Sequence, residues 1–412
     1  MIEAKMMDHL FRHQYGRMVS ILTRIFGLDQ LEIIEDAVQD TFVSALRTWR
    51  NQIPENPEAW LTKAAKNRAI DLFRKIKAEH NRALKLDSGP ATMALNDLFL
   101  NHEIEDSQLR MIFTACHPDI NVKDQIAFAL KTISGFSTKE IASALLVKEE
   151  TIRKRLLRSR KQIQELSLSF EIPSGKELPK RLDVVLEVVY LIFNEGFHSN
   201  RKDMLIRHDL CGEAIRLCQL LLKQDYLRHD AVYALLALLC FHASRLESKV
   251  NDQGDIIDLK NQDRTKWNTE LIALANTAMN RAVINNNFST YHYEAAIAAE
   301  HLKVKTFEAT NWNKILMWYE KLYEILPSAF NLLNTAIVLL QLNKLNTASK
   351  ILKDLNPSDL EQRAYLYYGA YSEYFKLTNQ NTKAVSCLDK ALMLVNNEAE
   401  KTYLQSKRAN FF

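Results

Sequence analysis

Apolar residues recur at intervals of three and four along most of this 412-residue chain, and runs that alternate Val or Thr with polar residues are almost absent. The first spacing is that of one face of an α-helix, whereas alternation is typical of a strand. Only nine glycines and eight prolines interrupt the pattern. We therefore predict an all-α fold, and the length suggests about two to four domains with separate cores.

Several classes of protein are disfavoured by the same sequence. No apolar run reaches the roughly 18 residues that a membrane span needs. The first residues, MIEAKMMDHLFRHQYGR, carry charges where a secretory signal has its apolar core. None of the five cysteines forms a C-x-x-C pair, which favours buried reduced thiols over a metal site or a disulfide. We expect a cytoplasmic protein with no membrane segment.

Two losses of helical periodicity divide the chain. One begins after residue 77 and contains Ser-Gly-Pro, and the other is EIPSGKELPKR, which starts at Glu171. The predicted organisation is a helical unit, a linker, a second helical unit and a long helical region, with the boundaries 1–77, 78–107, 108–170 and 182–412.

The last region contains a weak internal repeat. A shift of 36 residues, from 348 to 384, superposes one set of small and apolar residues on another: Ala348, Leu352 and Leu355 on Ala384, Leu388 and Ala391. This period is close to that of tetratricopeptide helix pairs. Pro327 and Pro357 fall where such helices end, so we predict stacked helical hairpins in this part of the chain.

The net charge is only +4, but basic residues gather in two places, residues 63–77 and 139–161. In the second place, Ser137 and Glu140 have the spacing of a capping box, which starts a short helix at about Thr138. After a turn at residues 146–148, a second helix buries Ile152, Leu156, Ser159 and Ile163. This is the spacing of a helix-turn-helix, although Leu146 stands where many such turns have Gly.

The exposed face of that second helix carries candidate DNA contacts, namely Thr151, Lys154, Arg155 and Arg158. Arginine reads guanine well because it donates to O6 and N7 together, so Arg155 and Arg158 are candidates for base contacts. Lys154, Arg160 and Lys161 are candidates for phosphate contacts. The alternative is a plain helical hairpin with a solvated basic face.

The first unit carries two further surfaces, on either side of the loop NQIPENPEAW. The helix DAVQDTFVSALRTW presents Asp36, Gln39 and Asp40 on one face, which suits a basic protein partner. The opposite face is an apolar stripe of Ile33, Ala37, Val38, Phe42, Ala45, Leu46 and Trp49. The helix EAWLTKAAKNRAIDLFRK combines aromatic and basic residues, which suit unstacked single-stranded bases. The alternative for this basic cluster alone is again a solvated helix face.

In these residues the chain resembles an extracytoplasmic-function (group 4, sigma-70 family) sigma factor of RNA polymerase. DAVQDTF and PEAWLTKAAKNRAIDLFRK resemble its sigma-2 domain, and the helix-turn-helix about seventy residues later resembles its sigma-4 domain. The resemblance implies core RNA polymerase and promoter DNA as partners. It assigns polymerase contacts to Asp36, Gln39 and Asp40. It assigns the −35 element to Thr151, Lys154, Arg155 and Arg158. It assigns the −10 element to residues 51–58 and to Trp60, Lys63, Asn67, Arg68, Asp71 and Arg74.

The remainder of the chain resembles the subgroup of these factors that has a long C-terminal tetratricopeptide-like extension. LRMIFTACHPDI, LEVVYLIFNEGF, LCGEAIRL and NQDRTKW carry this resemblance. We hypothesise that the extension docks on the sigma domains and regulates them, through a surface that includes Asn194, Glu195, Asp263 and Arg264. The alternative is that these four residues are buried structural pairs.

No enzyme signature emerges. His292, Glu294, Glu300 and His301 do not match the H-E-x-x-H spacing of a zinc site, so we expect no catalytic residue, no metal and no cofactor. Two other functions remain open. The first is a helix-turn-helix regulator that acts without polymerase, which would give the first unit no role. The second is a helical-repeat interaction scaffold, which would leave the basic clusters unexplained.

Overall fold

A computed structural model describes residues 2–49, 53–80, 101–145, 147–173, 175–198, 206–251 and 253–411. Within these ranges the regular elements are helices, and the one isolated bridge pairs Val250 with Ile256. The predicted all-α class is therefore confirmed. The chain divides into two compact units, residues 1–192 (unit 1) and 193–412 (unit 2).

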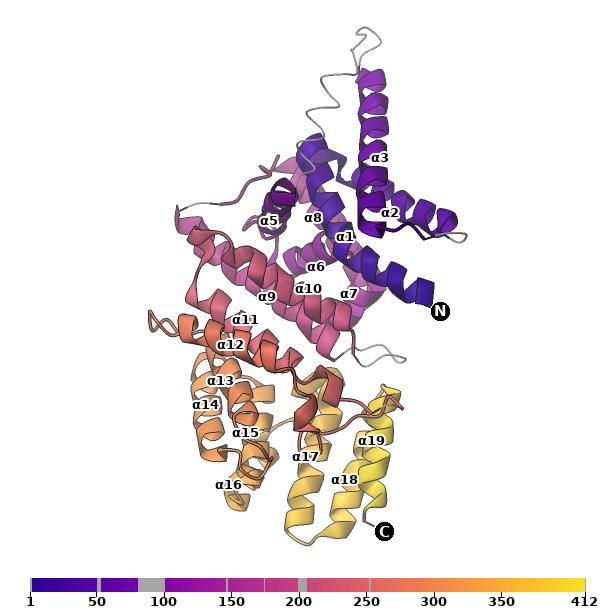
Figure 1. The fold of residues 1–412 in the computed structure, drawn as a ribbon. Helices are drawn as coiled ribbons and strands as arrows, with labels where there is room; N and C mark the ends of the chain where they lie inside the picture. Colours follow the sequence, from indigo (N-terminus) through magenta and orange to yellow (C-terminus); the bar gives the residue numbers. More distant parts are fainter. Residues whose placement is uncertain are drawn as a thin grey trace. The chain divides into compact units, whose positions relative to one another are not determined.

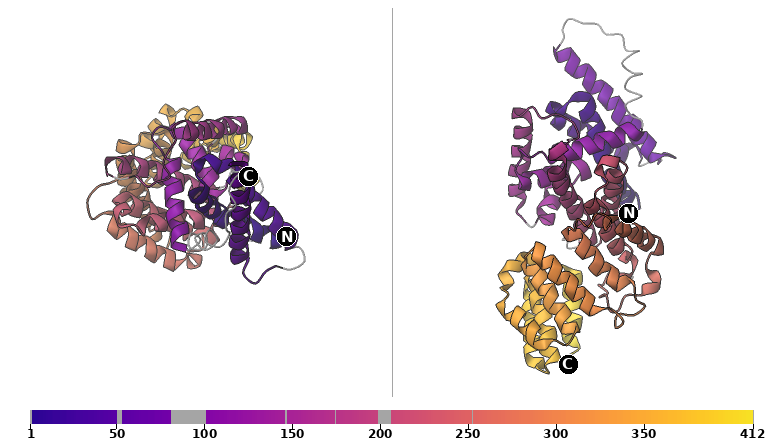
Figure 2. Two further views of the ribbon diagram at one scale, coloured as in Figure 1. Left: turned by 90° about the horizontal axis from the view of Figure 1, so that it is seen from above. Right: turned by 90° about the vertical axis from the view of Figure 1, so that its left-hand side faces the viewer.

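Unit 1 begins with α1 (Ile2–Phe26), the short 3₁₀ helix η1 (Leu28–Gln30), α2 (Leu31–Thr48) and α3 (Pro57–His80). Val19 and Leu22 of α1 are buried, as are Ile34, Val38 and Phe42 of α2. The C-terminal half of α3 stands clear of the other helices of this unit (Figures 1 and 2).

The apolar stripe of α2 is narrower than the sequence predicts. Ile33 and Leu46 are exposed, although both were expected in the stripe. At 3.6 residues per turn they lie about 140° and 80° from Val38 around the helix axis, outside the buried face.

The second half of unit 1 contains α5 (Asn101–Ala115), α6 (Val122–Ser134), α7 (Thr138–Ala144) and α8 (Glu149–Glu165). The predicted capping box is confirmed, because Ser137 and Glu140 bond each other's backbone at the start of α7. The predicted buried face of α8 is confirmed as well, with Ile152, Leu156, Ser159 and Ile163 inside. Leu146, in the turn, lies outside the described residues.

The two halves of unit 1 share one packed interior. α1 packs against α5 and α6 as well as against α2 and α3. At Gly16 the backbones approach so closely that a Cβ atom would lie 1.8 Å from the carbonyl oxygen of Ile133. Only glycine fits there without a shift of the backbone.

This packing was not expected from the sequence, which suggested separate modules on a linker. Of the predicted linker 78–107, residues 81–100 lie outside the described ranges. The boundaries 1–77, 108–170 and 182–412 stay predictions.

In α9 (Leu178–Phe197), which follows the 3₁₀ helix η2 (Gly175–Glu177), most residues belong to unit 1 and the last ones to unit 2. Unit 2 continues with α10 (His208–Leu222), α11 (Asp230–Ala243), α12 (Thr269–Ala282) and α13 (Thr290–Leu302). By length and composition, the stretch Asp230–Ser248 is apolar enough to cross a membrane. This corrects the prediction that the chain has no apolar run of that length. Of the apolar window in this stretch, 78% is buried, as in the core helix of a globular domain.

The chain ends in α14 (Trp312–Ile325), α15 (Ala329–Gln341), α16 (Leu345–Asp354), α17 (Ala364–Leu377), α18 (Asn381–Leu394) and α19 (Glu398–Ala409). Successive helices pack as neighbours, α15 on α16 and α17 on α18 (Figure 1). All six positions of the predicted repeat are buried. Pro327 follows α14, and Pro357 begins the 3₁₀ helix η6 (Pro357–Arg363), so both prolines stand at helix boundaries as predicted.

Candidate nucleic-acid interface

The exposed face of α8 opens onto a depression of about 460 Å³. It is lined by Asn121, Lys123, Asp124, Thr151, Arg155, Arg158 and Gln162. Three of the four predicted −35 contacts, all but Lys154, therefore converge on one concave surface. The side chain of Arg158 is 62% exposed, whereas that of Arg155 is only 12% exposed.

Asp124 in the first turn of α6 organises this surface. Its carboxylate, 2% exposed, accepts two hydrogen bonds from the Arg158 guanidinium, from Nε at 2.9 Å and from Nη2 at 2.8 Å. Nε of Arg155 lies 4.0 Å from the same carboxylate. The hydrogen bonds from Arg158 to Asp124 raise the pKa of Arg158. Both arginines are thus held by one buried carboxylate.

Sequence reasoning did not identify Asp124, because an acidic residue in the first turn of a helix is ordinarily explained by the helix dipole. The burial of its carboxylate is evident only in the structure. Asp124 lies beside Gln125 and Ile126 in a helix that buries ten of its residues. A buried carboxylate in such a helix requires a cation, and α8 supplies one.

Arg160, a predicted phosphate contact, pairs instead with Glu35 and Glu32 of α2. Three further basic residues of α8 pair with acids of the same helix. Arg153 bonds Glu149 at 2.8 Å, Lys154 lies 3.8 Å from Glu150, and Lys161 lies 3.4 Å from Glu165. These are exposed pairs four residues apart, which contribute little to stability. Lys154 therefore stays available to a polyanion.

The predicted polymerase contacts Asp36, Gln39 and Asp40 are all exposed on α2. Their neighbour Glu35 is buried and accepts a hydrogen bond from the Tyr15 hydroxyl at 3.3 Å. Burial, together with the Glu35 charge, raises the pKa of Tyr15 well above its ordinary value. The Tyr15–Glu35 hydrogen bond thus links α1 to the part of α2 that carries the acidic stripe Asp36, Gln39 and Asp40.

The predicted −10 helix, α3, has exposed side chains at Lys63, Asn67, Arg68, Asp71 and Arg74. Trp60 is half-buried and packs edge-on against Trp49, with ring centroids 5.3 Å apart. In the preceding loop, Asn56 Oδ1 accepts a hydrogen bond from the Ala59 backbone at 3.0 Å. Asn51 and Gln52, also predicted to contact the −10 element, lie outside the described residues.

The four residues of the predicted regulatory surface lie in different environments. Glu195 is buried and Asn194 is half-buried, so Glu195 does not belong to an exposed surface. Asp263 bonds Thr265 and caps the 3₁₀ helix η5 (Arg264–Lys266). Arg264 donates to the carbonyl oxygens of His301, at 2.6 Å, and Val304, at 2.8 Å. The contacts of Asp263 and Arg264 are those of a structural tie within unit 2.

Unit 2 contains two further cationic side chains near Arg264, those of Lys249 and Arg245. Lys249, 7% exposed, places its ammonium 3.6 Å from the centre of the Phe197 ring and donates to the Phe197 carbonyl. Burial, followed by the charge of Arg245, lowers the pKa of Lys249 to about 7. Burial, followed by the charge of Arg264, lowers the pKa of Arg245 to about 10.

Three parts of the chain match models of known families. Residues 10–79 match the family "Sigma-70 region 2" and residues 110–163 match "Sigma-70, region 4". Residues 181–283 match a "Family of unknown function (DUF6596)". The chain is similar to the uncharacterized protein R00370 of Rhizobium meliloti (strain 1021), at 30% identity over 380 residues. That match covers 91% of this chain and 89% of the relative.

A second relative carries a functional name. The ECF RNA polymerase sigma factor SigE of Mycolicibacterium smegmatis is 28% identical over 158 residues, which cover 38% of this chain and 60% of that protein. No solved structure matches the chain. The chain belongs to the sigma-70 family of RNA polymerase sigma factors. Within it, the chain falls in the extracytoplasmic-function group that carries a long C-terminal helical extension.

Proposed function

We propose that this sigma factor directs core RNA polymerase in the cytoplasm to promoters whose −35 element is read by the α8 depression and whose −10 element is opened on α3. The observation that carries the proposal is the convergence of Thr151, Arg155 and Arg158 on one surface of a helix-turn-helix. Asp124 holds the two guanidiniums, so less side-chain entropy is lost when they meet base edges.

Promoter opening needs a second surface. Each base-pair step that melts loses stacking of about 1.4 kcal/mol, so the factor must bind exposed bases better than paired ones. The exposed basic residues of α3 and its half-buried Trp60 suit that task, because base stacking on aromatic side chains contributes about 1–3 kcal/mol per base. Polymerase, held on the α2 stripe, supplies the rest. This mechanism uses no catalytic residue of the chain.

Run-off transcription with purified core polymerase on a genomic fragment library tests the proposal. We expect defined transcripts only when both proteins are present. A gel shift with and without polymerase separates the alternatives. Tight binding of a palindrome by the protein alone favours a conventional helix-turn-helix regulator. Absence of DNA binding in both conditions favours an interaction scaffold.

The proposal includes regulation by the C-terminal extension. Its support is the length of unit 2, which is larger than unit 1 and lies outside the two sigma-70 matches. Deletion after His198 is the appropriate test, because most of α9 belongs to unit 1 and would be lost by an earlier cut. The idea fails if the shortened chain transcribes to the same level and responds to the same conditions as the full chain.

A further inference from the structure

Two short 3₁₀ helices bring three cations of unit 2 together. Arg245 and Lys249 stand at the two ends of η4 (Leu246–Ser248), and Arg264 is the first residue of η5. The two helices pack against each other. The charge of Arg264 acts on Arg245, and the charge of Arg245 acts on Lys249. The three side chains therefore form one group, which we call the cation cluster.

One tryptophan joins the two ends of the cluster. The indole of Trp267, the residue that follows η5, donates to the Ser248 hydroxyl of η4 at 2.9 Å. Cζ of Arg264 lies over the same indole, 4.5 Å from the ring centroid. Because a buried hydrogen bond and a cation–π contact share this ring, the positions of η4 and η5 are linked.

Two histidines complete the cluster without adding charge. Nη2 of Arg245 lies 3.2 Å from Nδ1 of His242. Since arginine can only donate, this Nδ1 is the acceptor and the ring proton is on Nε2. Burial, followed by the charge of Arg245, lowers the pKa of His301 to about 4. Both rings are therefore neutral at pH 7 and offer hydrogen bonds alone.

The chain does not balance the charge of this cluster with acids. In the part of the chain that the structure describes, none of the three cations forms an ion pair. Glu400 acts on Lys249 and Glu308 acts on Arg264, each from beyond ion-pair distance. No carboxylate acts on Arg245. The cluster therefore has an excess of positive charge.

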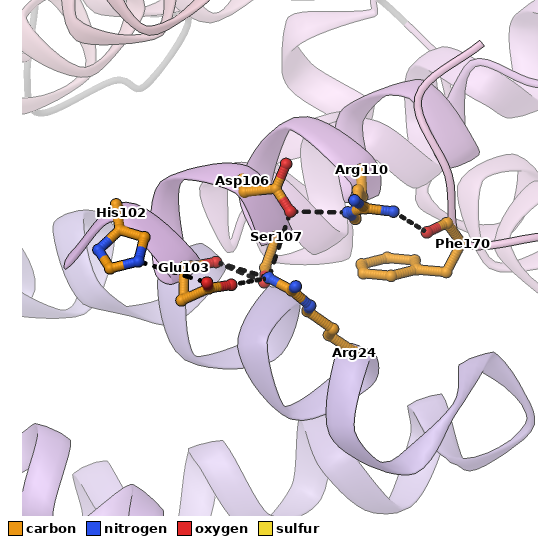
Figure 3. A network of polar contacts seen from close by, with 7 residues as sticks. All are labelled: Arg24, His102, Glu103, Asp106, Ser107, Arg110 and Phe170. Atoms are coloured by element: carbon orange, nitrogen blue, oxygen red, sulfur yellow. Dashed lines mark hydrogen bonds and ion pairs between the residues drawn. The ribbon is translucent and has the colours of Figure 1, made fainter. Parts of the chain in front are cut away.

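Comparable arginines of unit 1 do have carboxylate partners (Figure 3). Arg24 of α1 pairs with Glu103 and, at 3.2 Å, with Asp106 of α5. Arg110 pairs with Asp106 at 2.7 Å. The side chains of these two arginines are 27% and 30% exposed, whereas Lys249 as a whole residue is only 7% exposed. Burial of charge is costly without a counter-charge, so the deeper cluster needs one more than these pairs do.

Unused hydrogen-bonding atoms lie in the same place. Nη1 of Arg264 donates to the His301 carbonyl oxygen, so the two residues are neighbours. Nη2 of Arg264 and Nδ1 of His301 are both buried, and neither has a hydrogen-bond partner among the described residues. Buried polar groups are nearly always hydrogen-bonded, and Nη2 can only donate. The cluster therefore offers a buried donor as well as excess charge, and both suit an anionic acceptor.

We propose that the cation cluster, with His242 and His301, binds a small oxyanion of the phosphate type, either inorganic phosphate or the phosphate group of a metabolite. Phosphate oxygens accept charge-assisted hydrogen bonds from guanidinium and ammonium groups, and a dianion offsets the excess charge. Both histidines, Arg245 and Arg264 are half-buried, so a small ion reaches them from solvent. The depth of Lys249 favours such an ion over a nucleic-acid backbone. The inference concerns unit 2 alone and goes beyond the proposed function.

Isothermal titration of the full chain with inorganic phosphate tests the proposal, with the ionic strength held constant by sodium chloride. We expect saturable binding of one phosphate per chain. Glycerol 3-phosphate is titrated in parallel to distinguish the two sources. Tighter binding of this ester indicates a phosphorylated metabolite, and tighter binding of inorganic phosphate indicates the free ion. If neither probe binds saturably at millimolar concentration, the inference is wrong.

Variants test whether the phosphate lies in the cluster. Arg245→Met and Lys249→Met each remove one cation and should weaken phosphate binding about tenfold or more, because hydrogen bonds to charged groups are the strong ones. Arg281→Met, at an exposed position of α12, is the matched control and should bind as the wild type does. Equal affinity in all three variants places the phosphate elsewhere and overturns the inference.

Thermal melting gives a second measurement. Phosphate should raise the melting temperature of the wild type and of Arg281→Met more than that of the cluster variants, because a ligand stabilises the form that binds it. Phosphate also stabilises proteins in general through exclusion from their surface, and this part is common to all four proteins. Equal shifts in all four reduce the effect to that general one and contradict the proposal. If one cluster variant fails to fold, the other decides by the same comparison.

Discussion

Positive charge is placed in opposite environments in the two units. On α8 of unit 1, Lys154 and Arg158 expose most of their side chains, and Arg158 shares its acid with a second arginine. In unit 2, Lys249 and Arg245 lie against Phe197 and His242. The first arrangement leaves charge for a polyanion, whereas the second withdraws charge from solvent and uses it to tie helices together.

The comparison teaches that a basic residue indicates nucleic-acid binding only when its environment keeps it available. A buried cation costs desolvation and is held by carbonyl groups and aromatic rings, so its removal acts on stability. An exposed cation costs little to keep, and its removal acts on binding. The following experiments test whether this separation holds.

The largest effect is expected from a charge reversal on the exposed stripe of α2. Asp40→Arg should abolish binding to core polymerase and leave the unfolding temperature unchanged, because Asp40 is exposed. A pull-down with core polymerase and a thermal melt measure the two outcomes. Glu320→Arg, an exposed reversal in unit 2, is the control. An unaltered pull-down of the Asp40 variant removes this residue from the polymerase interface.

The next effect concerns the buried Lys249. Its pKa of about 7 lies below the ordinary 10.5, so between these values the unfolded chain holds a proton that the folded chain lacks. The free energy of unfolding should therefore rise with pH in this window, by about 1.4 kcal/mol per unit from this group. Lys249→Met should remove roughly 2–3 kcal/mol of the change between pH 7 and 9.

Urea unfolding at several pH values measures that difference, with the exposed Lys350→Met as control. Arg245, Arg363, Cys211, Glu400 and His198 also act on Lys249 electrostatically, and they are the same in both chains. Promoter-directed transcription by the Lys249 variant should match wild type. Parallel pH curves for the wild type and the variant would show that Lys249 keeps an ordinary pKa.

A third experiment exchanges the shape of a cation and keeps its charge. Arg158→Lys retains a positive group near Asp124 but loses the planar fork that contacts guanine and holds the carboxylate. We expect a loss of about 5- to 150-fold on a −35-dependent promoter, since a bidentate pair contributes about 1–3 kcal/mol of discrimination. Arg153→Lys on the same helix should change little. Equal losses in both variants argue against base reading by Arg158.

The smallest effect is expected for Lys154→Ala. One phosphate contact less should flatten the slope of log affinity against log salt by about 0.9, with little change in sequence preference. Promoter binding by the assembled polymerase between low and moderate salt measures this slope. Lys180→Ala at the start of α9 is the control. A steep, unchanged slope indicates that Lys154 makes no phosphate contact.

Local features of the fold were predictable because short-range chemistry determines them. The capping box at Ser137 and the buried face of α8 depend on residues three and four apart, and both appear as expected. The exposure of Asp36, Gln39 and Asp40 has the same origin. Helical spacing alone identifies these faces.

Long-range pairing was not predictable. Asp124 and Arg158 lie 34 residues apart in sequence, and Glu35 and Arg160 lie 125 apart, so no local pattern connects either pair. The low exposure of Arg155 likewise depends on its proximity to Asp124. In the sequence, Gly16 is an isolated glycine within a helix. Its close approach to the Ile133 carbonyl oxygen is evident only in the structure.

The burial of every cysteine has a consequence for how signals reach this protein. Burial raises the pKa of Cys116 to about 12 and that of Cys211 to about 12. At neutral pH a thiol of this kind is ionised in only about one molecule in 10⁵, and the thiolate is the species that peroxide attacks. Cys116 and Cys211 are therefore poorly suited to react with peroxide while the fold is intact.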